Sequence, residues 1–187
     1  MIDLKKMKKI LFTAILCFIG IQWACSQTEL TEEKKTSIRQ QVNKEASDLW
    51  DTLNRQGNLP PIMIEFMVDT FRIEQICRFK MEVDFSTQGI NQIIYDCTQE
   101  YDALLNKYYG QLIQKLNAAD RKLMQNSQRN WLSFRDQEKL VIEMLGKEEY
   151  TGGGSMQSNF TALDQCNLIK QRTIEIASHL LRISEFK

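Results

Sequence analysis

The stretch from Tyr95 to Leu145 most constrains the fold, because it carries two long apolar stripes with helical spacing. The first stripe steps mostly by three and four residues through Ile90, Ile93, Ile94, Cys97, Tyr101, Leu104, Leu105, Tyr108, Leu112, Ile113 and Leu116. The second follows the same rhythm through Leu123, Ser127, Trp131, Phe134, Glu138, Val141 or Ile142, and Leu145. This spacing predicts two helices. The join at residues 117–120 is short enough to require an antiparallel turn, and we expect Asp120 to cap the second helix.

The residues before this pair predict two further helical segments. The first runs from Thr31 to Arg55, and Gly57 can adopt the left-handed conformation that ends it. Pro61 can occupy the first turn of the next helix. Residues 62–85 begin with helical spacing and end with alternating spacing, so we expect a helix to about Lys80 and then an extended linker. Ser86 or Thr87 should cap the long helix that follows.

The last predicted helix spans residues 156–182 and follows a flexible loop of three glycines. Its near-heptad seam should dock between the two central helices. Together these patterns predict an all-α fold, an antiparallel helical bundle of three core helices with an additional N-terminal helical segment. We expect a signal peptide at 1–26, an N-terminal helical region at 27–85 and a bundle domain at 86–187.

The N-terminus has the features of a secretory signal peptide. Lys8 and Lys9 precede an apolar run over residues 10–21, and small residues at 24–26 suit a signal peptidase. Met7 is an alternative start to Met1. Cys25 leaves a second alternative open, a lipoprotein signal in which this cysteine carries the lipid anchor. We therefore expect export to the periplasm or the extracellular space, with membrane attachment only through such an anchor.

Charge and motifs exclude several classes of function. Loss of residues 1–26 would remove four lysines and one aspartate, leaving 20 basic and 23 acidic side chains and a net charge of −3. This charge argues against nucleic-acid binding, which needs a positive field. The glycines at 152–154 lack the Gly-Lys-Ser/Thr context of a phosphate loop. The sequence contains no Cys-x-x-Cys and no Cys/His cluster, so we expect no metal and no cofactor.

Three cysteines remain after residue 26, and an oxidising compartment permits a disulfide between two of them. Counting from the turn at 117–120 places Cys97 and Cys166 at one level of an antiparallel bundle, as bonding requires. We expect Cys97–Cys166 as the pair and Cys77 as the free thiol. The alternative is three reduced, buried cysteines that pack as small apolar residues.

The sequence argues against catalysis and directs attention to polar residues in the stripes. His179, the single histidine, has no nucleophile motif near it, and no pair of carboxylates is placed to face a cleft. The polar and aromatic candidates lie close to apolar positions on three predicted helices, and they are Asn106, Gln128, Trp131, Arg135, Asp136 and Arg172. They predict either a hydrogen-bonded polar layer that sets helix register or an exposed Trp/Arg patch for a protein partner.

These residues also resemble a known family. The motifs Tyr101-Asp102-x-x-Leu105-Asn106-x-x-Tyr109 and Gln128-Arg129-x-Trp131-x-x-Phe134-Arg135-Asp136-x-Glu138 are similar to those of the LprI-type lysozyme inhibitors. Gly153-Gly154-Ser155 and the last helix around Thr173 resemble the family's closing segment. The resemblance covers about residues 84–181 and implies an exported helical envelope protein, with lysozyme inhibition reported for some members.

This sequence departs from the family at one position that matters. The family often has a cysteine where this chain has Lys139, and the partner of that cysteine falls near Ile93. Loss of both fits replacement by another bridge, and no inhibitory loop is carried over.

The leading hypothesis is inhibition of a lysozyme-like muramidase by a non-catalytic binding protein. The alternatives are a structural or scaffold protein of the envelope, favoured by an apolar patch on the first helix or at 62–85, and a cell-wall enzyme, which needs a deep pocket with paired carboxylates.

Overall fold

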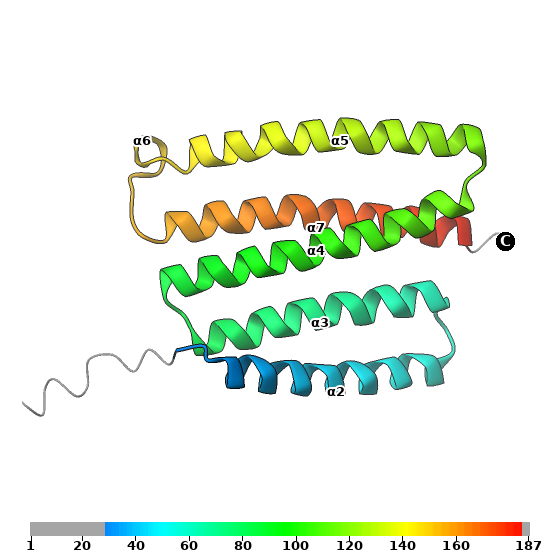
Figure 1. Ribbon diagram of the computed structural model, residues 1–187, viewed down its shortest axis with the longest axis horizontal. Helices are drawn as coiled ribbons and strands as arrows, with labels where there is room; N and C mark the ends of the chain where they lie inside the picture. The colour runs from blue at the N-terminus through cyan, green and yellow to red at the C-terminus, as the bar shows by residue number, and fades with distance from the viewer. Residues whose placement is uncertain (1–28, 185–187) are drawn as a thin grey trace, which may run out of the picture.

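The computed structural model describes residues 29–184, and every regular element in that range is a helix (Figure 1). The long helices are α2 (Glu32–Gln56), α3 (Pro61–Val83), α4 (Thr87–Lys115), α5 (Ala118–Leu145) and α7 (Gln157–Ser184). A single turn, α6 (Glu148–Thr151), precedes the last of them and was not predicted. The all-α prediction is confirmed for the described residues. The predicted leader at 1–26, with Cys25, lies outside them.

Local chemistry explains where several helices begin and end. Gly57 has a φ of 66°, the left-handed conformation predicted for the end of α2. Pro61 is the first residue of α3, where its missing amide hydrogen leaves no helical bond unmade. The Ser86 hydroxyl accepts a hydrogen bond from the Gly89 amide at 2.9 Å, so Ser86 caps α4 as predicted.

The prediction that Asp120 caps α5 is wrong. The cap is Asn117, whose Oδ1 accepts a hydrogen bond from the Asp120 amide at 3.0 Å. Asn117 immediately precedes the first helical residue, and an Asn side chain can accept from the third helical amide. Asp120 lies one turn in, where its charge still favours the positive end of the helix dipole.

The extended linker predicted after Lys80 is shorter than expected. Helix α3 continues to Val83, and residues 84–86 alone separate it from α4. The helical period persists because Ile73, Cys77 and Lys80 are all buried at steps of four and three. Because one of these buried positions holds a lysine, the helical spacing of apolar residues is interrupted there and does not reveal the last turn of the helix.

The five long helices lie side by side in the order α5, α7, α4, α3, α2 (Figure 1). The last helix was expected to dock into a groove between the two central helices, whereas α7 packs mainly against α4 and separates α4 from α5. Consequently α4 and α5, although joined by the predicted antiparallel turn, do not pack along their lengths. Helices α2 and α3 form a hairpin that joins the layer through α3.

The main core lies around α4, between α3 and α7. Tyr101, Leu105 and Tyr108 of α4 are almost fully buried there, together with Ile169 and Ile176 of α7. A second, smaller cluster between α2 and α3 contains Ala46, Leu53, Ile64 and Val68. The predicted boundary between a helical region and a bundle domain at residue 85 stays a prediction. Ile73 and Cys77 of α3, which precede it, belong to the main core.

Candidate functional site

Arg172 of α7 joins the last helix to α5 through a buried hydrogen bond. Its Nε donates to Oε1 of Gln128 at 3.0 Å, and its Nη1 donates to Oε2 of Glu175 at 3.0 Å. The arginine is only 8% exposed, and Gln128 is the one residue of α5 that is classed as buried. The remaining nitrogen, Nη2, is buried and has no hydrogen-bond partner among the described residues.

Trp131 lies at the same level, and two guanidinium groups approach its ring. The Cζ of Arg172 lies 5.6 Å from the ring centroid, and the Cζ of Arg135 lies 5.7 Å from it. Arg135 in turn donates to Oδ1 of Asp136 from Nε at 2.9 Å and from Nη2 at 2.7 Å. A cation over the face of an indole is attracted by the negative charge of the ring face.

A groove of about 540 Å³ runs along this junction between α5 and α7. Phe134 and Ile142 of α5 and Leu168 of α7 supply its apolar lining. Its charged lining consists of one guanidinium and three carboxylates, from Arg172, Glu138, Asp164 and Glu175. The groove therefore combines an apolar floor with a net negative rim.

An exposed apolar stripe borders the groove on α5. Leu123, Phe134, Val141 and Leu145 are spaced by 11, 7 and 4 residues, which brings them to nearly the same side of a helix. All four are exposed, with Phe134 at 52%. Contiguous exposed apolar surface on a folded protein commonly marks an interaction site.

The structure brings together four of the six candidate residues predicted from the sequence. Gln128, Trp131, Arg135 and Arg172 meet at the junction of α5 and α7, and Asp136 reaches it only through Arg135. Asn106 lies elsewhere, on α4, where its Nδ2 donates to Oδ2 of Asp102 at 3.2 Å. Asn106 does not take part in this contact, because α7 lies between α4 and α5 (Figure 1).

Sequence reasoning missed a set of hydrogen bonds and an ion pair between α4 and its neighbours α3 and α7. The Tyr101 hydroxyl donates to Oε1 of Glu74 at 2.5 Å, and Lys170 pairs with the same carboxylate. The Tyr108 hydroxyl donates to Oδ2 of Asp69 at 3.0 Å. These interactions could have been expected from the sequence, because Tyr101 and Tyr108 occupy apolar stripe positions and a buried hydroxyl needs a hydrogen-bond partner.

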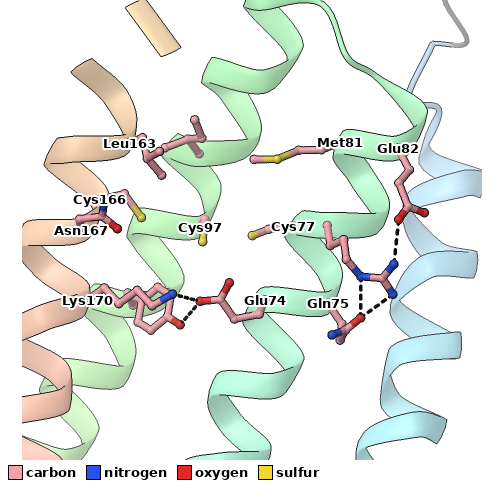
Figure 2. Close-up of a pocket in the computed structure, with 13 residues that line it drawn as sticks. Glu74, Gln75, Cys77, Met81, Glu82, Cys97, Leu163, Cys166, Asn167 and Lys170 are labelled. Carbon is pink, nitrogen blue, oxygen red and sulfur yellow. Dashed lines mark hydrogen bonds and ion pairs between the residues drawn. The ribbon is translucent and has the colours of Figure 1, made fainter. Parts of the chain in front are cut away.

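A second pocket, of about 640 Å³, opens between α3, α4 and α7 (Figure 2). Cys77, Cys97 and Cys166 line it, and all three are buried free thiols. Cys97 and Cys166 lie close together in this pocket, which agrees with the predicted common level of these residues. Their disulfide stays a prediction. Cys77, expected to stand apart, lines the same pocket beside Cys97.

No group of His, Cys, Asp and Glu within 29–184 is arranged to hold a metal ion. His179 is exposed on α7. No helix in the described part of the chain is both long and apolar enough to cross a membrane.

Comparison with known proteins bears on this region of the chain. The model of the family described as "Lysozyme inhibitor LprI" matches residues 77–176, which is more than half of the 187 residues. The matched segment includes the last turns of α3, all of α4, α5 and α6, and most of α7, so it contains the whole groove. Searches of curated proteins and of solved structures found no match. The match agrees with the resemblance read from the motifs at 101–109 and 128–138, and the chain belongs to the LprI family of lysozyme inhibitors.

Proposed function

We propose that the protein is exported and inhibits a lysozyme-type muramidase by binding it with the groove between α5 and α7. The observation that carries this proposal is the family match, which covers both walls of the groove. The export step rests on the predicted signal peptide at 1–26, whose removal leaves a net charge of −3. On this proposal the protein is a binding protein and performs no catalysis.

The chemistry of the groove suits such a partner. The exposed Phe134 can insert into a pocket of the partner, since interface energy concentrates in a few aromatic anchors. The carboxylates of Glu138, Asp164 and Glu175 would attract the surface of a basic lysozyme and speed the encounter. An inhibitor seated over the muramidase cleft would keep its substrate from the carboxylate pair that performs glycoside hydrolysis.

The scaffold alternative predicted an apolar patch on the first helix or at residues 62–85. Among the described residues there, the large exposed apolar side chains are Trp50 and Phe85. The exposed apolar residues gather instead on α5 and α7, in the family-matched segment. This distribution supports the inhibitor proposal over the scaffold.

The test measures lysozyme action on a suspension of bacterial cell walls, followed by turbidity, with purified residues 27–187 added. We expect the lysis rate to fall as the protein reaches micromolar excess. Phe134→Ala and Glu138→Lys should each weaken inhibition about tenfold, the effect of losing roughly 1.4 kcal/mol of binding free energy. The matched controls are Trp50→Ala and Asp48→Lys on α2, at the far edge of the layer (Figure 1), and these should inhibit like the unchanged protein. Unchanged lysis at micromolar excess would overturn the proposal.

A further inference from the structure

The three cysteines that follow residue 26 meet at one place although they come from three helices. Cys77 lies on α3, Cys97 on α4 and Cys166 on α7. In Figure 2 their sulfur atoms face a common space in the pocket between these helices. Close approach of cysteines from separate helices is the geometric condition for disulfide formation.

Cys97 is the central member of the cluster. It lies on α4, the helix between α3 and α7, and therefore stands between Cys77 and Cys166 (Figure 2). Both of these thiols lie close enough to Cys97 to influence its pKa, and Cys97 influences that of Cys166 in turn. The two pairs of neighbouring cysteines therefore both contain Cys97.

We propose that Cys97 is the shared partner of two mutually exclusive disulfides, Cys97–Cys166 and Cys77–Cys97, which interconvert by attack of the remaining thiol. The oxidant is a small-molecule disulfide, which the pocket of about 640 Å³ is large enough to admit. One cysteine thiolate attacks the oxidant, forming a mixed disulfide and expelling one small thiolate. A second cysteine thiolate then closes the internal bond and expels the other, so two protein thiols are oxidised as one small disulfide is reduced.

The interconversion consumes no oxidant. In the Cys97–Cys166 form, the Cys77 thiolate attacks the sulfur of Cys97, the old bond breaks, and the expelled Cys166 thiolate takes up a proton. The two forms differ in what they join. The Cys97–Cys166 bond ties α4 to α7 inside the bundle, and the Cys77–Cys97 bond ties α3, with its hairpin partner α2, to α4. The choice of disulfide therefore decides whether α7 or α3 is joined covalently to α4.

The environment makes these thiols slow to react. The neighbouring Cys166 thiol favours the Cys97 thiolate, but the neighbouring Cys77 thiol and burial outweigh it and raise the pKa of Cys97 to about 12. The neighbouring Cys97 thiol, together with burial, also raises the pKa of Cys166. Because the thiolate is the attacking species, exchange should accelerate as the pH rises above neutrality.

The experiment oxidises reduced, folded residues 27–187 with glutathione disulfide, quenches samples with acid at intervals, and maps the bonds by mass spectrometry. The unchanged chain should yield both bridged peptides, in a ratio that changes with time. Cys77→Ser should yield the Cys97–Cys166 bond and Cys166→Ser the Cys77–Cys97 bond. Cys97→Ser should form an internal bond at least tenfold more slowly than either.

The same three variants oxidised in guanidinium chloride serve as the control, since an unfolded chain lets any two cysteines meet. Circular dichroism checks that each variant folds, and Cys97→Ala replaces Cys97→Ser if the latter does not. The proposal is overturned if Cys97→Ser forms a Cys77–Cys166 bond as fast as the other variants form theirs. It is also overturned if a folded Cys77→Ser or Cys166→Ser variant forms no internal bond.

Discussion

The guanidinium of Arg172 lies over the ring of Trp131, with its Cζ 5.6 Å from the ring centroid, and this contact joins α7 to α5. The hydrogen bond from Arg172 to Gln128 reinforces the joint one turn away. Gln128 is the one buried residue of α5, so these contacts form the most buried part of its junction with α7. The groove proposed for the partner therefore depends on them.

Trp131→Ala should lower the free energy of unfolding by about 2 kcal/mol. Truncation of a buried aromatic side chain costs about 3–5 kcal/mol, and Trp131 is only partly buried. Urea denaturation followed by circular dichroism measures the change. Leu140→Ala, at an exposed position of the same helix, should change stability by less than about 0.5 kcal/mol. Equal effects of the two substitutions would show that Trp131 does not anchor α5.

Lys80→Met should be close to neutral, and Asp96→Ala should destabilise by about 2 kcal/mol. The Lys80 ammonium is buried and lies 3.0 Å from Oδ2 of Asp96, which is half exposed. Replacing a buried charge with an apolar side chain of similar length removes its desolvation cost, whereas removing only its partner leaves that charge unpaired. Thermal and urea unfolding of both variants give the comparison. The reverse order of stabilities would contradict it.

Tyr108→Phe should cost about 1 kcal/mol, the usual net worth of a buried hydrogen bond. The Tyr108 ring is fully buried, and its hydroxyl donates to Asp69 at 3.0 Å. The phenylalanine keeps the ring and removes the donor alone. Tyr95→Phe, on the exposed side of α4, is the matched control and should leave the urea midpoint unchanged. A loss at Tyr95 as large as that at Tyr108 would contradict the assigned hydrogen bond.

Stability should fall in acid partly through Glu74. Burial alone would raise its pKa, but the hydrogen bonds from Lys170 and Tyr101 outweigh burial, and the net effect lowers the pKa below the reference value of 4.5. A lowered folded-state pKa means that the contribution is complete above pH 4.5 and is lost as the pH falls toward the lowered value. Urea midpoints measured between pH 7 and pH 3 should therefore drop less for Glu74→Gln than for the unchanged chain. Glu33→Gln, at the exposed start of α2, provides the control and should keep the slope of the unchanged chain.

The helices could be predicted because burial acts on one side of each. The stripe of α4 and the seam of α7 repeat with a helical period, and Gly57, Pro61 and Ser86 have local roles that short-range sequence reveals. The end of α3 was misjudged because Lys80 occupies a buried position. The cap of α5 was misjudged because two polar residues compete within one turn: Asn117 immediately precedes the helix, and Asp120 lies inside its first turn.

Helical spacing explains part of the contact between α5 and α7. Gln128, Trp131 and Arg135 share one face of α5, so their proximity follows from that spacing alone. Arg172 comes from another helix, and Asn106 lies on α4, so how these two lie relative to α5 depends on the packing of the helices. The same holds for the position of Cys77 beside Cys97, which depends on how α3 lies against α4.

By itself, the sequence determined that this chain is helical, where most helices begin and end, and which faces of α4 and α7 are buried. Those features follow from interactions between residues a few positions apart. The tertiary structure alone decided that α7 covers α4, that α5 rests on α7 with an exposed apolar stripe, and that three cysteines lie together. An apolar stripe predicts a helix but does not decide what covers it, because burial of apolar surface is not directional.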